Sequence, residues 1–212
     1  MPVPPLLLLA AFAFAQDQPP TGLQICPLRT VAIGAVCMDK YEAPNDAGKK
    51  PLVFKTAGEG EAWCAERGKR LCTEAEWVRA CEGPSKRPYP YGADYKKGAC
   101  NDDKIWRVVD WAKLARYPAS DAVDYAASLD QSEPSGHRWD CVSEEGVHDL
   151  TGNVAEWVRR SFPNRRNYPH VLKGCYWAGC FGGSAPSCAF VNPEHPGQFR
   201  TYEAGFRCCK DR

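Results

Sequence analysis

Two cysteines in the last third of the chain have the spacing of a reactive pair. Cys175 and Cys180 enclose four residues, Tyr-Trp-Ala-Gly. Two thiols at this spacing could act as a metal-binding or redox pair. They could also form a structural disulfide that closes a small loop. We favour the disulfide, and the spacing alone leaves the reactive pair open.

Two carboxylates flank a glycine turn further upstream. Asp149 and Glu156 lie seven residues apart, with Gly152 between them. Ca²⁺ takes six to eight hard oxygens and combines carboxylates with backbone carbonyls, which a tight turn can direct inward. The alternative is a turn whose Asp and Glu only accept hydrogen bonds from backbone amides. From the residues alone, this alternative is favoured.

Other catalytic chemistry is not indicated. The sequence has no closely paired C-x-x-C units, which argues against structural zinc. It has no G-x-S-x-G motif, P-loop or dinucleotide-binding fingerprint, so a hydrolase or a nucleotide enzyme is unsupported. None of the four histidines stands at metal-ligand spacing from another; they are His137, His148, His170 and His195.

The N-terminus has the pattern of a secretory signal. An apolar run at 6–15 is about ten residues long, and a bilayer requires about twenty helical residues. The run ends in Ala13-Phe14-Ala15, the small-x-small pattern that signal peptidase recognises. The alternative is a buried N-terminal strand, because no Lys or Arg precedes the run. We predict a signal peptide at 1–15, a flexible N-terminus at 16–24, and a secreted or periplasmic protein with no transmembrane segment after cleavage.

Composition favours one disulfide-rich domain at 25–212. The 212 residues include 27 basic and 26 acidic side chains, so no electrostatic argument supports nucleic-acid binding. About 195 residues remain after cleavage, enough for a sizeable core. All twelve cysteines lie in this part, and disulfides are their default state in an oxidising compartment.

Local patterns predict the elements that would hold these residues. Residues 25–39 alternate around a turn at Gly34, which indicates a hairpin with Cys26 and Cys37 on its arms. Thr73 and Glu76 form a capping box that begins a helix ending at Gly83. Further expected elements are helices at 62–67 and 106–115, strands at 154–158, 170–173 and 205–209, and a long loop at 174–196.

Six segments, in order, carry a resemblance to a known family. They are MDKYEAPN at 38–45, GKRLCTEAEW at 68–77, YPYG at 89–92, GVHDLTGNVAEW at 146–157, LKG at 172–174 and GFRC at 205–208. Their order and spacing resemble the formylglycine-generating enzyme, or sulfatase-modifying-factor, domain from about Cys37 to Cys209. The resemblance implies an irregular, loop-rich, disulfide-stapled α+β fold related to C-type lectins.

The resemblance changes the interpretation of the glycine turn. In the family this segment binds Ca²⁺ through a side chain at the Asp149 position, carbonyls at the Gly152 and Val154 positions, and a carboxylate at the Glu156 position. All four positions match, so Ca²⁺ is the expected ligand. A second calcium site of the family begins near Asn101, and its later ligands have no clear match.

The resemblance also implies cysteine pairs. It pairs Cys64 with Cys208, and Cys81 with Cys188, the latter displaced by one residue from the family's position. Cys72 and Cys209 are additions to the family pattern and make a reasonable third pair. Proximity and elimination then leave Cys26 with Cys37, and Cys100 with Cys141.

The catalytic cysteines of the family are not matched. Formylglycine-generating enzymes oxidise a sulfatase cysteine with O₂, using Cu(I) on a C-x₄-C pair of soft thiolates. Without gaps, the two catalytic positions fall on Gly179 and Ser184, and the active-site tryptophan position falls on Ala155. Cys175 and Cys180 stand about four residues early, and only a local shift could place them in the same groove.

Two functions from different classes follow. The first is an exported, non-catalytic scaffold that binds a protein or glycan partner. The alternative is a copper-dependent formylglycine-generating oxidase, which would need Cu(I) and catalytic Cys175 and Cys180. The state of these two cysteines separates the hypotheses.

Overall fold

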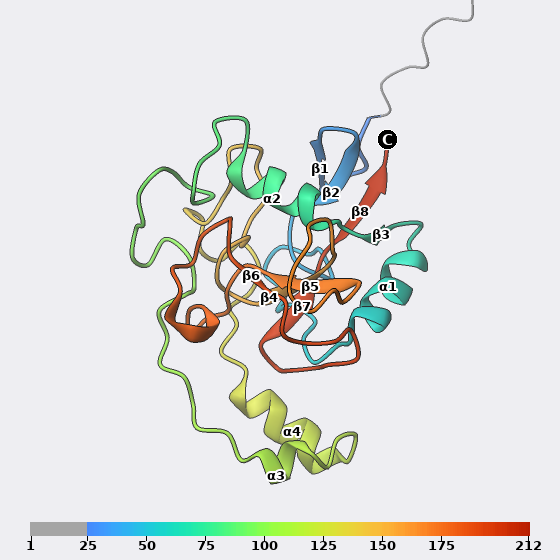
Figure 1. The fold of residues 1–212 in the computed structure, drawn as a ribbon, viewed down its shortest axis with the longest axis vertical. Helices are drawn as coiled ribbons and strands as arrows, with labels where there is room; N and C mark the ends of the chain where they lie inside the picture. The colour runs from blue at the N-terminus through green and yellow to red at the C-terminus, as the bar shows by residue number, and fades with distance from the viewer. Residues whose placement is uncertain (1–24) are drawn as a thin grey trace, which may run out of the picture.

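Two four-stranded sheets form the frame of residues 25–212, which the computed structural model describes (Figure 1). The first sheet has the order β1 (Thr30–Ile33), β2 (Val36–Asp39), β8 (Cys208–Asp211), β3 (Arg70–Leu71). The second has the order β6 (Val191–Asn192), β5 (His170–Lys173), β4 (Ala155–Arg159), β7 (Ala204–Phe206). The predicted signal peptide and the segment 16–24 lie outside the described residues.

The N-terminal hairpin confirms the prediction for 25–39. Strands β1 and β2 pair antiparallel, with Thr30 opposite Asp39, around a turn in which Gly34 has φ 58°. Strand β8 adds to the other edge of β2, with Cys209 opposite Met38. The two ends of the described chain therefore meet in one sheet (Figure 1).

Helices α1 (Ala57–Ala65) and α2 (Glu74–Glu82) both begin with a capping box. The Thr73 cap confirms the predicted start of α2. The helix expected at 62–67 instead begins at Ala57, because Thr56 and Glu59 form the second capping box. The sequence does not indicate that α1 begins at Ala57, because Gly60 lies in its first turn and glycine is a poor helix former. A Cβ on Gly60 would lie 3.1 Å from the Phe206 ring, so the close packing of α1 against this ring favours glycine there.

The helix predicted at 106–115 is much shorter than expected. Only α3 (Trp111–Leu114) forms, because the Asp110 side chain caps it by accepting from the amides of Ala112 and Lys113. The next helix, α4 (Ser120–Leu129), was not predicted. The two helices pack together below the sheets in the view of Figure 1.

The closing segment differs from the single strand predicted at 205–209. It forms two strands, β7 and β8, which belong to different sheets. Arg207 lies between them and is fully buried. The long loop at 174–196 contains β6 and a single 3₁₀ turn at Phe181–Gly183.

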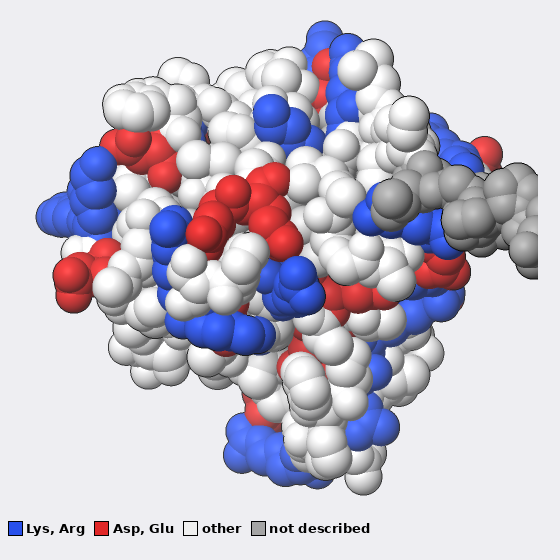
Figure 2. Space-filling model, turned by 90° about the horizontal axis from the view of Figure 1, so that it is seen from above, with Lys and Arg blue, Asp and Glu red and all other residues white. Residues whose placement is uncertain are grey.

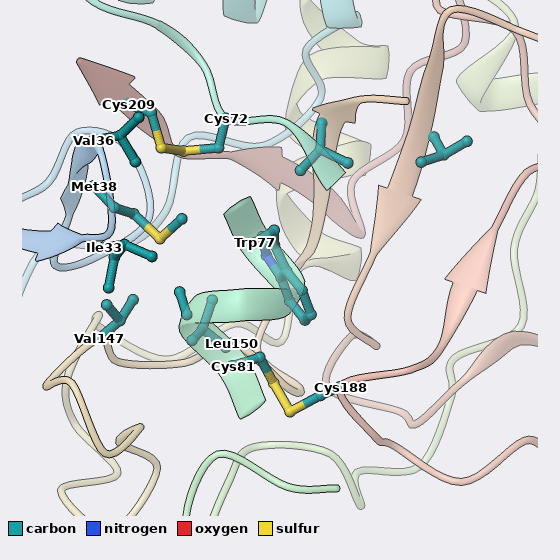
Figure 3. Packing of buried hydrophobic residues seen from close by; sticks show 13 residues of the cluster. Ile33, Val36, Met38, Cys72, Trp77, Cys81, Val147, Leu150, Cys188 and Cys209 are labelled. Atoms are coloured by element: carbon teal, nitrogen blue, oxygen red, sulfur yellow. A yellow bond between two sulfur atoms is a disulfide. The ribbon is translucent and has the colours of Figure 1, made fainter. Parts of the chain in front are cut away.

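Trp77 of α2 is the centre of the largest core cluster (Figure 3). Its ring lies between two disulfides, Cys72–Cys209 and Cys81–Cys188, as Figure 3 shows. The indole is completely buried against apolar side chains from the hairpin and from β4 and β5. Helix α2 is thereby attached to the first sheet and to the loop that follows β5.

All twelve cysteines are paired, so no free thiol remains. The bridges are Cys26–Cys37, Cys64–Cys208, Cys72–Cys209, Cys81–Cys188, Cys100–Cys141 and Cys175–Cys180. The first five join the pairs expected from the sequence, and the sixth is the disulfide favoured there over a reactive Cys175 and Cys180 pair. In the described part of the chain, no helix combines the length and hydropathy needed to cross a membrane.

Candidate functional site

A charge centre made of Glu42, Asp149, Glu156 and Arg207 lies inside the fold. Each of these side chains is at most 3% exposed. Asp149 begins a tight turn that leads into β4, and Gly152 continues it with φ 83°. Arg207 reaches the same place from the break between β7 and β8. The resemblance identified Asp149 and Glu156, whereas Arg207 was not singled out.

Arg207 neutralises Glu156 directly. Its Nε donates to Glu156 Oε2 at 2.7 Å, and its Nη2 donates to Glu156 Oε1 at 2.6 Å. Trp77 Nε1 donates to Glu156 Oε2 at 3.0 Å. A buried ion pair keeps its charges only with such additional hydrogen bonds. Glu156 is therefore part of the folded core.

The other two carboxylates have only uncharged donors. Asn153 Nδ2 donates to Glu42 Oε1 at 2.8 Å, and the Gly136 amide donates to Asp149 Oδ2 at 2.7 Å. Burial raises the pKa of both carboxyls above their usual range. Three carboxylates thus face one guanidinium, and the centre has an excess of two negative charges when all are ionised.

The expected calcium residues are close in sequence, and the structure puts them in one buried turn. The surplus of two negative charges and the oxygen-rich donor set suit a divalent hard cation. The neighbouring Asn101 Oδ1 and Asp102 Oδ2 are buried without hydrogen-bond partners. Glu156 differs from a free carboxylate ligand, because Arg207 already donates hydrogen bonds to both of its oxygens. The residues fit Ca²⁺ in charge and donor type, with Asp149 as the principal side chain.

A second region, the aromatic cavity, lies on the other side of β4 and β5 and has a volume of about 260 Å³. Six of the side chains that line it are aromatic rings: Trp106, Trp111, Tyr176, Phe181, Phe190 and Phe199. Ala155, Cys175, His195 and Glu203 also line it. Ala155, which the resemblance aligned with the family's active-site tryptophan, is one of these lining residues.

The disulfide Cys175–Cys180 shapes one wall of the cavity. It closes a loop in which Tyr176 and Gly179 exchange backbone hydrogen bonds of 3.2 and 2.9 Å. Gly174, which precedes the loop, must be glycine, since a Cβ there would lie 2.7 Å from the Leu150 carbonyl oxygen. In this oxidised state neither cysteine offers a thiolate to a metal.

Among residues 25–212, Glu203 is the one acidic residue that lines the cavity. Its Oε1 accepts from Trp106 Nε1 at 3.0 Å, and burial raises the pKa of its carboxyl. His195 stacks on Phe199 with ring centroids 3.8 Å apart, and burial lowers the pKa of its imidazole. Burial, with a smaller effect of Glu203, raises the pKa of Tyr176 to about 12. The cavity is therefore apolar, with one negative group.

Sequence reasoning missed most of this cavity. Trp106 and Glu203 are 97 positions apart, Trp111 begins α3, and Phe181 lies in the 3₁₀ turn of the long loop. The only signal in the sequence is the number of aromatic residues, which says nothing of their convergence. Elsewhere on the surface, Figure 2 shows acidic and basic side chains interspersed over the face it displays, in agreement with the balanced total charge.

Comparison with known proteins places this geometry in a family. The sulfatase-modifying factor enzyme 1-like domain matches residues 30–212, and the chain belongs to this family. The chain is 29% identical over 164 residues to the inactive C-alpha-formylglycine-generating enzyme 2 of Bos taurus, covering 74% of this chain and 49% of the relative. It is 29% identical over 113 residues to the formylglycine-generating enzyme of Mus musculus, covering 51% of this chain and 26% of the relative. The chain thus spans about half or less of these relatives.

Solved structures show the same fold. CarF superposes with a TM-score of 0.59 at 13% identity, covering 84% of this chain and 86% of that one. PvdO from Pseudomonas aeruginosa superposes with a TM-score of 0.53 at 19% identity, covering 77% and 63%. At these identities the similarity concerns the fold alone. It agrees with the loop-rich α+β fold expected from the sequence.

Proposed function

We propose that the chain is an exported, non-catalytic member of the sulfatase-modifying-factor family that binds a protein or glycan partner at the aromatic cavity. The observation that carries the proposal is the disulfide between Cys175 and Cys180 in the cavity wall. The two positions aligned with the family's catalytic cysteines are Gly179 and Ser184, which have no sulfur. The cavity therefore has surface for binding and no thiolate pair for copper.

Three further observations support this function. Aromatic side chains supply large contact areas and are enriched where proteins bind partners. A relative at 29% identity bears the name of an inactive enzyme. Six disulfides suit an oxidising compartment, which supports export to the extracellular medium or the periplasm.

A thiol count on the folded protein, with and without Cu(I), tests the proposal. We expect no reactive thiol, no copper uptake and no conversion of a sulfatase-type cysteine peptide to formylglycine. Cys180→Ser is the matched control, because it leaves one thiol on Cys175 and shows that a thiol in this wall can be detected. Two native thiols with copper uptake and peptide oxidation would instead establish the oxidase alternative.

We also propose that the charge centre holds Ca²⁺, with Asp149 and the turn carbonyls of Gly152 and Val154 as ligands and Glu156 as the fourth, shared with Arg207. The support is the group of three buried carboxyls with one guanidinium, whose fully ionised form a divalent cation would balance. We expect a chelator to lower the melting temperature of the wild type and to have less effect on Asp149→Ala. The control is Asp46→Ala, in an exposed pair with Arg29, which should respond to chelator as the wild type does. An equal shift in Asp149→Ala, or no shift in the wild type, would rule out calcium here.

A further inference from the structure

Glu203 is unusual among the half-buried carboxylates of this protein because it has no cationic partner. Glu133 is held by Arg138 and Lys104, and Glu61 is held by Arg159. Glu203 accepts only from the Trp106 indole and from the neighbouring Tyr202 hydroxyl. Within residues 25–212, no Lys or Arg lines the aromatic cavity.

The aromatic rings around Glu203 have the property that an organic cation needs. The face of an aromatic ring is electronegative and attracts a cation placed over it, most strongly for tryptophan and when water is excluded. Trp106 and Trp111 are partly exposed at the cavity, and Phe181 is 64% exposed. Their surfaces are available to a ligand, and the Glu203 carboxylate lies beside the Trp106 indole, 3.0 Å from its Nε1.

We propose that the aromatic cavity binds an alkylated ammonium cation, whose positive charge pairs with Glu203 and whose alkyl groups contact Trp106, Trp111 and Phe181. The inference rests on the proposed binding function and names the chemical class of the ligand. The cavity volume of about 260 Å³ leaves room for a trimethylammonium group and a short chain.

The low polarity of the cavity favours an alkylated ammonium group over a primary ammonium group. A primary ammonium has three N–H donors, and each loses a water molecule when it enters a site with few acceptors. A quaternary ammonium has no donor to satisfy, so its methyl groups can contact rings while its charge remains. An anion is disfavoured, because Glu203 repels it and the buried imidazole of His195 has a lowered pKa.

Titration with choline and with its neutral isostere 3,3-dimethyl-1-butanol tests the proposal. Both ligands have the same shape, so their difference in affinity, measured by calorimetry and by tryptophan fluorescence, isolates the charge. We expect choline to bind about tenfold tighter to the oxidised wild-type protein. The preference should fall at least threefold in Glu203→Gln, which keeps the size of the side chain and leaves only the attraction of the ring faces.

Glu194→Gln is the matched control, since Glu194 pairs with Arg165 and Arg166 and should leave the preference intact. Equal affinity of the two ligands, undetectable choline binding, or an undiminished preference in folded Glu203→Gln would each overturn the proposal. N-acetyl-trimethyllysine amide, as a third ligand, separates a protein side chain from a free small molecule as the source of the cation. Binding of neutral sugars alone would rule out a cationic ligand and leave the proposed binding function intact. Copper-dependent oxidation of a sulfatase-type cysteine peptide would rule out the non-catalytic binding function itself.

Discussion

The charge centre and the aromatic cavity are separated by the thickness of one sheet. Neighbouring residues of β4 point to opposite faces, so Ala155 lines the cavity and Glu156 enters the charge centre. Both regions place carboxylates in apolar surroundings. The charge centre contains its own cation, Arg207, whereas the cavity contains none for Glu203. The difference separates a centre whose charges, together with the proposed Ca²⁺, stabilise the fold from a cavity whose carboxylate is left for an organic ligand.

The strand β5 shows the same division. Lys173 lies opposite Glu156 and points toward the Trp77 ring, with Nζ 5.2 Å from the ring centroid. Its neighbours Leu172 and Gly174 line the aromatic cavity. A substitution on one face of the sheet should therefore change stability, and one on the other face should change binding.

The largest expected effect is the removal of the buried cation. We expect Arg207→Met to lower the free energy of unfolding by about 3–5 kcal/mol, because Glu156 keeps its charge without its partner. Arg165→Met is the control, since Arg165 is 74% exposed and its pair with Glu194 should contribute less than about 1 kcal/mol. Chemical denaturation measures both. Similar losses for the two variants would remove the distinction between the buried and surface charges.

Next in size is the disulfide in the cavity wall. Cys175→Ala with Cys180→Ala should cost about 2 kcal/mol, because the bridge closes a loop of only a few residues. We also expect weaker choline binding, since the wall loses its constraint. Cys26→Ala with Cys37→Ala removes another short-range bridge, far from the cavity, and should leave choline affinity unchanged. If both double variants kept full affinity, the bridge would have no part in shaping the cavity.

A smaller effect of opposite sign is expected at Lys173. Burial lowers its pKa to about 8 from a usual 10.5, so the charged form destabilises the fold below pH 8. Between about pH 8 and 10.5 the unfolded chain binds the proton and the folded one does not, and stability therefore rises with pH. Lys173→Met should add about 1–2 kcal/mol at pH 7, and the gain should shrink toward pH 10. A gain that does not change with pH would show that packing, and not charge, is responsible.

The smallest change in stability should come from Glu203→Gln. Because Glu203 has no cation to lose and its carboxylate is disfavoured by burial, we expect unfolding free energy to stay within about 0.5 kcal/mol or to rise slightly. Thermal melts at neutral pH measure this. A loss as large as that of Arg207→Met would mean that Glu203 also serves the fold.

The parts of this fold that were predictable depend on local chemistry. The turn at Gly34 and the capping box at Thr73 are each encoded within a few residues, and the structure contains both. The start of α1 was missed because Gly60 is selected by packing against Phe206 and not by helix propensity. The break at Arg207 was missed because an arginine within a strand pattern gives no sign that its side chain turns inward.

The candidate sites follow the same rule. The acidic turn from Asp149 to Glu156 is contiguous, so the resemblance could point to it. Its cation Arg207 is 51 residues from Glu156, and only the fold brings the two together. The aromatic cavity has no local pattern at all, because its rings come from segments that are far apart in the sequence.

The adjacent cysteines of β8 have a consequence for how the chain reaches this structure. Cys208 and Cys209 point to opposite faces of the strand, where Cys208 bonds Cys64 in one core cluster and Cys209 bonds Cys72 in the other. Exchange of the two partners would slip the strand by one residue, and a slip of one residue turns every side chain to the wrong face. During oxidative folding these two bonds therefore fix the register of β8. A mispaired isomer would have the side chains of β8 on the wrong faces, and its disulfides would have to be reduced before the protein could reach the native fold.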